Sequence, residues 1–302
     1  MKAMALQLPR LRKSVPLAPL TTYHIGGPAD LFFEAHTAAE LAQAVMAARA
    51  AHLNYFVLGS GANILIGDRG FRGLVIHNRA SHVRWQGTQL SAESGISIDT
   101  LIRQSQTRGL SGLEHFAGIP SSLGGAIRQN LHFLSPDRQG TVFIASVVKS
   151  AKLLLADGQV RQFDRAGLTF GYDDSLLHHQ PAVVLTATLE LIPKSPTDIA
   201  KQIQANLAWR RAKQPQLDEL ASCGSVFKKI AGVGAGRLIE QTGLKGMRIG
   251  QVQVSPQHAN YLVNLGGATA AQVRRLIEHV QQTVARQTGY QLEPEIGFIG
   301  DF

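Results

Sequence analysis

The segment Gly59-Ser-Gly-Ala-Asn63 is the feature that most limits how this chain can fold. It directly follows the apolar stretch Asn54–Leu58 and runs into Ile64–Ile66, and both flanking stretches have the composition of strands. Glycines permit positive φ and lack the Cβ atoms that would hold a phosphate away from backbone N–H groups. The pattern therefore predicts a strand–loop–strand unit that binds a phosphate-bearing ligand, with Ser60 and Asn63 as further donors.

The same segment has other interpretations. A Rossmann fingerprint is incomplete here, because the third glycine is missing and a strand, not a helix, is predicted to follow the loop. A P-loop is excluded because no Gly-Lys-Ser/Thr sequence follows. Taken alone, Gly59–Asn63 fits a tight hairpin between two buried strands equally well.

A second glycine-rich segment, Gly118-Ile-Pro-Ser-Ser-Leu-Gly-Gly125, also lies beside apolar chain. Two such loops in one lobe can bind both phosphates of a dinucleotide through backbone amides, without charged side chains. The alternative is a pair of structural turns. The predicted cofactor-binding residues are Gly59, Ser60, Gly61, Ala62, Asn63, Gly118, Ile119, Pro120, Ser122, Gly124 and Gly125.

The composition indicates a globular protein of two or three packed units, since 44% of the 302 residues are hydrophobic and 17% are charged. The longest apolar candidate, Tyr55–Ile66, is interrupted by the glycine loop and falls short of the roughly 20 residues that span a bilayer. The N-terminal segment lacks the apolar stretch of a signal peptide. The single cysteine, Cys223, excludes an intrachain disulfide framework and a zinc cluster. We expect a cytoplasmic protein without a membrane partner or a metal.

The formal net charge of +9, from 30 Lys and Arg against 21 Asp and Glu, suits an anionic ligand such as a nucleotide diphosphate. A nucleic acid would also suit this charge. However, no block of five or six like charges occurs, and only 6% of the residues are aromatic. We therefore expect no nucleic-acid partner.

The order of the predicted elements indicates an α+β protein of two lobes, with a boundary near Lys194–Pro196. Thr37 is a candidate N-cap of the first helix, and Asp157-Gly158 is a candidate hairpin turn. The predicted helices are Thr37–Ala51, Ile98–Arg108, Thr197–Lys213 and Thr269–Gly289. The further predicted strands are Phe71–His77, Val83–Ala92, Val142–Ala156, Gln159–Phe163, Ala182–Pro193, Gln251–Val254 and Tyr261–Val263.

A set of motifs spread from about residue 15 to residue 302 resembles the UDP-N-acetylenolpyruvoylglucosamine reductase family, in the same order throughout. Each motif alone is unspecific, whereas the set is specific. Besides the loops at Gly59 and Gly118, the motifs are Thr21-Thr-Tyr-His-Ile-Gly-Gly-Pro-Ala-Asp30, Arg211-Ala-Lys-Gln-Pro215, Gly224-Ser-Val-Phe-Lys228, Ala235-Gly-Arg-Leu-Ile-Glu-Gln-Thr-Gly-Leu-Lys-Gly246, the stretch Ser255–Asn264 and Leu292-Glu-Pro-Glu-Ile296.

The resemblance implies an FAD-binding lobe of the vanillyl-alcohol-oxidase (PCMH) type in two subdomains, followed by a C-terminal α+β substrate lobe. The expected division is an N-terminal segment 1–19, FAD-binding subdomains 20–78 and 79–194, and a substrate-binding domain 195–302. Because residues 197–302 leave little room for an inserted substrate-covering loop, the chain is more similar to the shorter branch of the family.

The resemblance also implies the chemistry. NADPH would reduce a non-covalently bound FAD, and the flavin would reduce the enolpyruvyl ether of a UDP-sugar to a lactyl ether, giving UDP-N-acetylmuramate for peptidoglycan. We expect the protein to act as a monomer.

The residues implied for catalysis are Ser225 as proton donor and Glu295 as the group that assists charge stabilisation at the vinyl acid. A serine is a weak acid, so its value would be positional. The alternative for Ser225 is a cap of the turn before Val226, and the alternative for Glu295 is a surface position. The implied substrate-binding residues are Tyr172, Lys213, Lys228, Arg237, His258 and Asn260, and solvation explains any one of the lysines and the arginine equally well.

The sequence departs from the family at three places. Asp173 stands where an arginine is expected to neutralise the substrate carboxylate, and Gly297 stands where a second arginine is often found. The stretch Leu131–Pro136 is bulkier than the small residues and tyrosine of the family pattern. Reversing a charge replaces attraction by repulsion. The candidates for a replacement cation are Arg128, His132, Arg138, His178 and His179.

Two rival hypotheses remain open from the sequence. The chain could be an FAD-binding paralogue with an altered substrate or without reductase activity, which would explain Asp173 and Gly297. It could also be an oxidase with covalently attached flavin, for which Cys223 is the only available thiol.

Overall fold

The computed structural model describes residue 6 and residues 8–230 and 232–302, which form two compact units. Residues 1–5 and 7 of the predicted N-terminal segment lie outside the described residues. Unit 1 comprises the described part of Met1–Leu11 together with Phe33–Ser60 and Leu74–Trp209. Unit 2 comprises Arg12–Phe32, Gly61–Gly73 and Arg210–Phe302.

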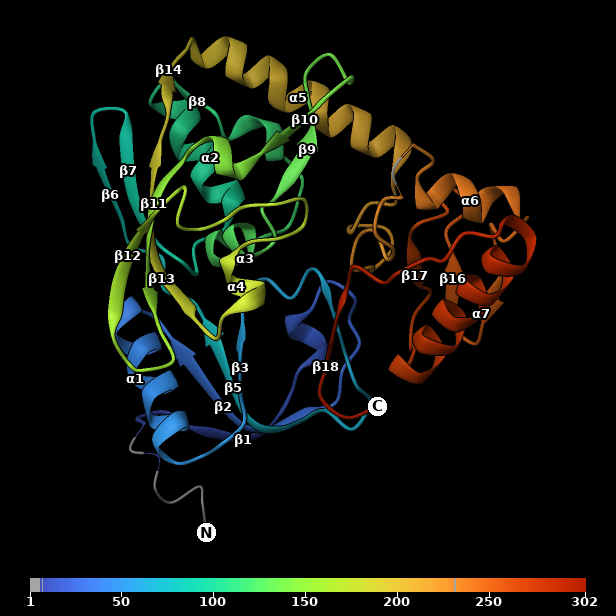
Figure 1. The fold of residues 1–302 in the computed structure, drawn as a ribbon, viewed down its shortest axis with the longest axis horizontal. Coiled ribbons are helices and arrows are strands. Elements are labelled where there is room, and N and C mark those ends of the chain that lie inside the picture. The colour runs from blue at the N-terminus through green and yellow to red at the C-terminus, as the bar shows by residue number, and fades with distance from the viewer. Residues whose placement is uncertain (1–5, 7, 231) are drawn as a thin grey trace. The chain divides into compact units, whose positions relative to one another are not determined.

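The largest sheet of unit 1 is antiparallel, with the strand order β12-β11-β13-β7-β6 (Figure 1). Gly158, with φ +82°, turns the chain between β11 and β12, and Leu153 pairs with Arg161. The predicted Asp157-Gly158 hairpin is thereby confirmed. The strands are β6 (Val83–Gln86), β7 (Gln89–Glu93), β11 (Val148–Leu154), β12 (Val160–Asp164) and β13 (Val183–Glu190).

Unit 1 also contains three further strand pairings. In one of them, β3 (Tyr55–Leu58) runs parallel to β5 (Phe71–Asn78), with Tyr55 opposite Leu74. The other pairs are antiparallel and join β8 (Leu110–Ser111) to β14 (Ile192–Pro193) and β9 (His132–Leu134) to β10 (Thr141–Phe143).

Four helices of unit 1 begin directly after a residue whose side chain caps them. Thr37 accepts a hydrogen bond from the Glu40 N–H, and Ser97 accepts one from the Thr100 N–H. The predicted helices Thr37–Ala51 and Ile98–Arg108 are thereby confirmed. The helices are α1 (Ala38–Ala50), α2 (Ile98–Thr107), α3 (Leu123–Arg128), α4 (Leu176–His179) and α5 (Pro196–Lys213), whose last residues, from Arg210, belong to unit 2.

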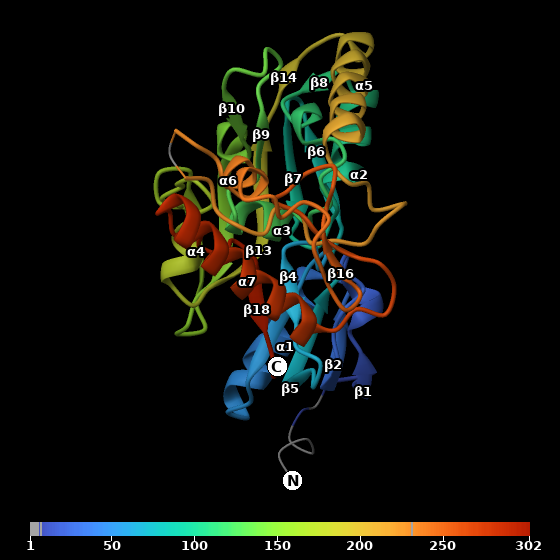
Figure 2. The same ribbon diagram turned by 90° about the vertical axis from the view of Figure 1, so that its right-hand side faces the viewer.

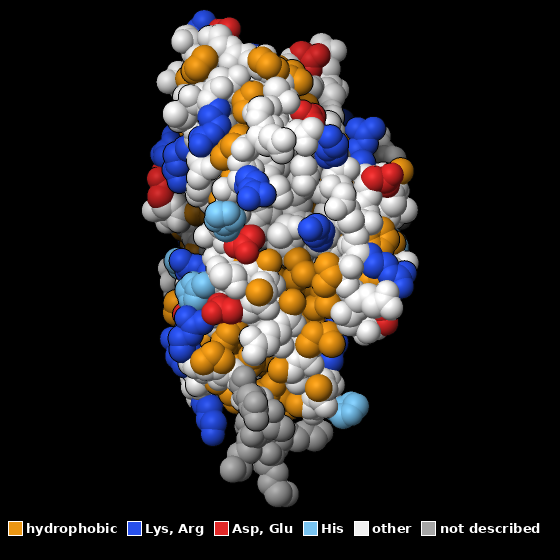
Figure 3. Space-filling model, turned by 90° about the vertical axis from the view of Figure 1, so that its left-hand side faces the viewer, with side chains coloured by type: hydrophobic (Ala, Val, Ile, Leu, Met, Phe, Trp, Pro, Cys, Tyr) orange, Lys and Arg blue, Asp and Glu red, His pale blue; other side chains and the backbone are white. Residues whose placement is uncertain are grey.

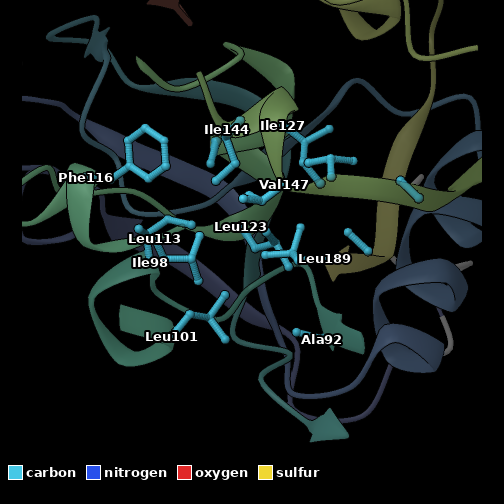
Figure 4. Packing of buried hydrophobic residues seen from close by; sticks show 14 of the residues in the cluster. Ala92, Ile98, Leu101, Leu113, Phe116, Leu123, Ile127, Ile144, Val147 and Leu189 are labelled. Atoms are coloured by element: carbon cyan, nitrogen blue, oxygen red, sulfur yellow. The ribbon is translucent and has the colours of Figure 1, made fainter. Parts of the chain in front are cut away.

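The hydrophobic core of unit 1 fixes the second glycine-rich segment from both sides. Leu123 and Ile127 of α3 are fully buried in the cluster that also contains Ile98 and Leu101 of α2 (Figure 4). Phe116, at the end of a 3-10 turn, is buried in the same cluster. Burying each such side chain contributes about 1.5–3 kcal/mol, so the chain between the turn and α3 has anchored ends.

Unit 2 is built from short strands and two helices. In it β1 (Arg12–Pro16) is antiparallel to the first residues of β2 (Pro28–Ala35), and β4 (Ile64–Ile66) is parallel to β18 (Gly297–Ile299). A three-stranded antiparallel sheet has the order β15-β16-β17. Its strands are β15 (Arg248–Ile249), β16 (Val252–Val254) and β17 (Leu262–Asn264), and the helices of unit 2 are α6 (Ala235–Gln241) and α7 (Ala270–Thr288).

The long helix α7 packs against α6 and the sheet strands β15 and β16, and it is the red helix in Figure 2. Its start is a capping box, because Thr269 and Gln272 satisfy each other's backbone N–H groups. The Asp68 carboxylate accepts hydrogen bonds from the N–H groups of Ala270 and Ala271 at 2.7 and 3.0 Å, where the helix dipole favours a negative charge. Gly289, with φ +77°, ends the helix.

Several sequence expectations about the elements are confirmed, including the α+β class and the helices α5 and α7. Others differ. The predicted strand Val83–Ala92 is two strands, because Gly87 adopts φ +58° and reverses the chain. The predicted strand Val142–Ala156 is interrupted by a 3-10 turn at Ile144–Ser146.

The hairpin interpretation of Gly59–Asn63 is wrong. The strand before this loop, β3, pairs with β5, and the strand after it, β4, pairs with β18. Since β3 and β4 have different partners, the loop does not close a hairpin.

Among the described residues, no helix is long and apolar enough to cross a bilayer. On the face in Figure 3, Lys and Arg side chains are spread out, with acidic side chains among them.

Candidate active site

The two glycine-rich segments meet in unit 1 at Gly59 and Ser122. A Cβ atom on Gly59 would lie 2.4 Å from the Ser122 Oγ, so position 59 accepts only glycine unless Ser122 moves. Ser122 is itself held, because its Oγ caps α3 by accepting a hydrogen bond from the Gly125 N–H at 3.2 Å. The close approach of the two backbones is therefore built into the fold.

The amides at the start of α3 are already used within unit 1. The N–H of Gly124 donates to the Ser94 carbonyl at 2.7 Å, and the N–H of Leu123 donates to the Ile96 carbonyl at 2.8 Å. A Cβ on Gly124 would lie 3.2 Å from Ser94, so Gly124 permits this close packing. Gly124 and Gly125 therefore leave space for a ligand because they lack side chains, whereas their N–H groups already have partners within unit 1.

The amides of Gly59–Asn63 differ from those of α3. Among the residues that the structure describes, none of these five N–H groups donates to a protein acceptor. Gly61 has φ +63°, and a Cβ there would lie 2.3 Å from the Leu20 carbonyl oxygen, so glycine is required. Its carbonyl oxygen accepts a hydrogen bond from the Thr22 N–H at 3.1 Å. Consecutive free amides in a side-chain-poor loop fit a phosphate group.

In unit 2, the segment after Gly224 is paired on both sides. The Val226 N–H donates to the Asn260 carbonyl at 2.9 Å, and the Glu295 N–H donates to the Val226 carbonyl at 2.8 Å. Ser225, which precedes Val226, is half-buried. Two residues that lie 70 positions apart in the sequence, Ser225 and Glu295, are thus brought onto neighbouring backbone segments.

The side chain of Asn260 holds this segment in place. Its Oδ1 accepts from the Phe227 N–H at 2.9 Å, and its Nδ2 donates to the Phe227 carbonyl at 2.8 Å. Both residues are buried. The amide of Asn260 therefore acts on the backbone beside Ser225, and its predicted contact with substrate stays a prediction.

Tyr261 lies beside Ser225, with the charge of Arg210 near it, and the sequence analysis included neither among the site residues. Ser225 and Tyr261 form an antiparallel bridge, so their backbone segments are neighbours. Burial raises the pKa of Tyr261, and the Arg210 charge opposes this shift. Burial lowers the pKa of Arg210, and Tyr261 opposes that shift. Arg210 immediately precedes the Arg211–Pro215 motif, and this position in the sequence could have indicated that Arg210 lies near the site.

Cys223 belongs to the hydrophobic core of unit 2 and is only 2% exposed. Burial raises the pKa of its thiol. Because the thiolate is the reactive form, burial opposes covalent attachment of a flavin at this cysteine.

The predicted substrate-binding residues differ in their surroundings. His258 packs edge-on against the Tyr261 ring at 5.0 Å, and burial lowers its pKa. The basic side chains Lys213, Lys228 and Arg237 are exposed, and Lys228 pairs with Glu293. Tyr172 belongs to unit 1 and is 46% exposed. Unit 2 thus brings His258 and Asn260 to the segments beside Ser225, and the substrate-binding roles of all six residues stay predictions.

The carboxylate of Asp173 lies 3.5 Å from the Nδ1 of His132, and only 10% of the Asp173 side chain is exposed. The His132 ring also contacts the Tyr172 ring, with 4.7 Å between centroids. Asp173 has φ +52°, in a turn where the Gly171 N–H donates to the Asp174 carbonyl. A cationic His132 would offset the negative charge at this position.

Three of the other four candidate cations have different partners. Arg128 donates to the Leu177 carbonyl, and His179 lies 2.8 Å from the Asp174 carboxylate. Arg138 stacks over the Trp209 ring at 5.5 Å. Of the five candidates, His132 is the one paired with Asp173 in the part of the chain that the structure describes.

Gly297 lies in β18 opposite Ile64. A Cβ at this position would lie 3.4 Å from the Ile64 Cγ2, which is an ordinary contact. Packing within unit 2 therefore does not require glycine here.

Within the described ranges, no cluster of three or more His, Cys, Asp or Glu side chains is arranged to hold a metal ion.

Two family models match the chain. The model of an FAD binding domain matches residues 29–164. The model of the C-terminal domain of UDP-N-acetylenolpyruvoylglucosamine reductase matches residues 214–299. The first match includes both glycine-rich segments, and the second includes Ser225, Tyr261 and Glu295.

Similar proteins extend over nearly the full length of the chain. UDP-N-acetylenolpyruvoylglucosamine reductase of Moorella thermoacetica is 40% identical over 95% of this chain and 92% of its own length. The Synechococcus sp. (strain JA-3-3Ab) protein of the same name is 39% identical over 97% of this chain and 92% of its own length. The crystal structure of the Thermus caldophilus enzyme superimposes with a TM-score of 0.80 and 30% identity, covering 96% of this chain and 99% of that chain.

Proposed function

Because this chain belongs to the UDP-N-acetylenolpyruvoylglucosamine reductase family, we propose that it reduces the enolpyruvyl ether of UDP-N-acetylglucosamine-enolpyruvate to UDP-N-acetylmuramate. NADPH is the proposed reductant, and the chain is an FAD-dependent oxidoreductase of peptidoglycan synthesis. The observation that carries the proposal is the placement of Ser225 beside Glu295 in unit 2, where the Glu295 N–H donates to the carbonyl of Val226.

The glycine-rich segments are the proposed FAD site. The free amides of Gly59–Asn63 suit the diphosphate of a dinucleotide, and the close approach of Gly59 to Ser122 excludes a side chain at position 59. Ile119 and Pro120 are proposed to contact the cofactor through their apolar surfaces. Bound FAD would supply the hydride for the double bond.

Ser225 is the proposed proton donor to the carbon that does not receive the hydride. Negative charge builds on the substrate carboxylate during hydride addition, and an enzyme gains most by stabilising that charge. Glu295 is proposed to assist there, as a carboxyl group held on the neighbouring backbone segment. Within unit 2, the clamp of Asn260 on Phe227 limits the movement of Ser225.

Binding of the UDP-sugar is assigned to the segment 195–302, which we propose as the substrate-binding domain after two FAD-binding subdomains, 20–78 and 79–194. The exposed side chains Lys213, Lys228 and Arg237 suit the diphosphate. His258 and Tyr172 complete the proposed set. We further propose that the protein acts as a monomer in the cytoplasm.

Asp173 does not exclude this function, because His132 lies 3.5 Å from its carboxylate. We propose that His132 supplies the positive charge that the chain lacks at position 173. The second candidate, an FAD-binding paralogue with a different substrate, is favoured by the same Asp173 and by Gly297, which packing does not require.

One experiment separates the two candidates. The purified protein is mixed anaerobically with NADPH, and the reduced flavin is then mixed with the enolpyruvyl UDP-sugar while its absorbance is followed. The reductase predicts reoxidation that depends on the UDP-sugar and is lost in Ser225→Ala, with flavin reduction by NADPH retained. Ser146→Ala, at an exposed serine of unit 1, is the matched control. Flavin reduction without reoxidation by this substrate would instead support the paralogue.

A further inference from the structure

We propose that Thr22 is a positioning residue, which links the segment before Ser225 to the glycine loop and so couples cofactor binding at the loop to the placement of Ser225. The inference rests on the proposed function, in which the loop binds the FAD diphosphate and Ser225 donates a proton. Thr22 acts through its protein neighbours and is assigned no contact with either ligand.

The backbone of Thr22 contacts the part of the glycine loop that belongs to unit 2. Its N–H donates to the Gly61 carbonyl at 3.1 Å. A Cβ on Gly61 would lie 2.8 Å from the Thr21 Cα and 2.3 Å from the Leu20 carbonyl oxygen. Gly61 therefore packs directly against the segment that carries Thr22, with no side chain between them.

The side chain of Thr22 contacts a distant segment of the same unit. Its Oγ1 donates to the Ser222 carbonyl at 2.8 Å, and the Ser222 N–H donates to the Thr22 carbonyl at 3.2 Å. Thr22 is half-buried and Ser222 is only 1% exposed, so water competes little for these bonds. The chain continues from Ser222 through Cys223 and Gly224 to Ser225, so Thr22 holds the start of the segment that carries the proposed proton donor.

The glycine loop is held in a similar way on the side of Glu295. The Asn63 carbonyl accepts from the Gly297 N–H at 3.0 Å, and β4, which follows Asn63, runs parallel to β18. Gly297 comes two positions after Glu295. The carbonyls of Gly61 and Asn63 therefore bind the two segments that lead to the residues proposed to act on the substrate.

The peptide groups of Gly61–Asn63 can bind protein and ligand at the same time. Among the described residues, their N–H groups donate to no protein acceptor, whereas the carbonyls of Gly61 and Asn63 do accept. The N–H and C=O of one trans peptide unit point in opposite directions. The unit whose carbonyl accepts from Thr22 therefore directs its N–H, that of Ala62, away from Thr22 and leaves it for a phosphate oxygen.

Thr22→Val isolates the side-chain link, because it removes the hydroxyl and keeps both the volume and the N–H that donates to Gly61. Thr22→Ser restores the hydroxyl. Thr242→Val is the matched control, at a half-buried threonine of unit 2 whose hydroxyl donates to the Ile239 carbonyl at the same distance of 2.8 Å.

Hydrogen–deuterium exchange of the full chain, with and without bound FAD, measures the coupling directly. In the wild type, Thr22→Ser and Thr242→Val, FAD should slow amide exchange in residues 222–225 as well as in residues 61–63. In Thr22→Val, FAD should still slow exchange in residues 61–63, but its effect on residues 222–225 should be lost. Equal protection of residues 222–225 in the wild type and Thr22→Val would overturn the inference.

The two half-reactions of the holoenzyme give a second readout. Oxidation of the reduced flavin by the enolpyruvyl UDP-sugar should slow roughly 10- to 100-fold in Thr22→Val and recover in Thr22→Ser. Reduction by NADPH should not change, because that step does not use Ser225. An unchanged oxidation rate in Thr22→Val, or an equal slowing of both half-reactions, would overturn the inference.

The outcomes separate the inference from the proposed function. A wild-type protein in which FAD protects residues 222–225, but whose reduced flavin is not oxidised by the UDP-sugar, would overturn the proposed function and leave the Thr22 link supported. A wild-type protein that binds no FAD would overturn both.

Discussion

The side-chain amide of Asn260 holds both the N–H and the carbonyl of Phe227, at 2.9 and 2.8 Å. This contact joins the segment that carries Ser225 to the segment that carries Tyr261, together with the bond from the Val226 N–H to the Asn260 carbonyl and the Ser225–Tyr261 bridge. Glu295 is joined to the same segment from the other side, through its N–H and the Val226 carbonyl. The residues proposed to act on the substrate thus depend on a backbone arrangement to which one buried side-chain amide contributes.

Asn260→Ala should lower the free energy of unfolding by about 2–4 kcal/mol, because it leaves two buried backbone groups of Phe227 without partners. Asn260→Asp keeps the oxygen that accepts from the Phe227 N–H and loses the donor to its carbonyl. Urea unfolding followed by circular dichroism measures both variants. An Asn260→Ala protein as stable as the wild type would show that the clamp contributes nothing.

Gly59→Ala should greatly reduce FAD binding, because the added Cβ would lie 2.4 Å from the Ser122 Oγ and push the two glycine segments apart. The test is the amount of FAD retained after purification and the affinity for added FAD. Gly140→Ala is the control, since its nearest neighbour would be the Ser135 Oγ at 3.3 Å. Full FAD binding by Gly59→Ala would contradict the assigned role of this loop.

His258 should make the protein less stable as the pH falls below about 6.5, the pKa of an unperturbed histidine. Burial lowers its pKa in the folded state, so the unfolded chain binds more protons in this window and is favoured there. His258→Asn supplies an uncharged acceptor in place of the Nδ1 that accepts from the Asn260 N–H.

The free energy of unfolding, measured in urea at several pH values between 5 and 8, checks this prediction. The decline toward acid should be smaller in His258→Asn than in the wild type. His52→Asn, at an exposed position with φ +49° that asparagine tolerates, serves as the control. Identical pH profiles for the wild type and His258→Asn would count against a buried, neutral His258.

His132→Ala should raise the KM for the enolpyruvyl UDP-sugar, because it removes the histidine that lies 3.5 Å from the Asp173 carboxylate. The increase expected from one unbalanced charge in a partly buried place is about tenfold. Adding Asp173→Asn should recover part of the loss, since the repelling charge is then gone. Steady-state kinetics of the single and double variants test this prediction. An unchanged KM in His132→Ala would show that His132 does not supply the positive charge for the substrate.

Local signals in the sequence predict the capped and amphipathic elements well. Thr37 and Thr269 cap the helices that start after them, and the apolar spacing of α7 matches its buried side. The short helices α3 and α6 show no amphipathic pattern, because six or seven residues containing glycine do not establish a period. The turn at Gly87 was hidden by apolar and β-branched residues on both sides.

The active-site prediction shows the same limit. Ser225 and Glu295 were identified from the resemblance, but the sequence does not show that their segments are neighbours, since this pairing joins distant parts of the chain. Tyr261 was not identified, because its bridge to Ser225 exists only once these distant parts of the chain have come together. Contacts of this kind arise from tertiary structure and leave no local pattern.

The most direct test of the account is mass spectrometry of the enolpyruvyl UDP-sugar after incubation with the purified protein and NADPH. The account predicts that the sugar is recovered as its reduced lactyl ether, in an amount equal to the NADPH consumed, and that no product forms with Ser225→Ala. Recovery of the unchanged enolpyruvyl sugar from protein that holds FAD and is reduced by NADPH would contradict it.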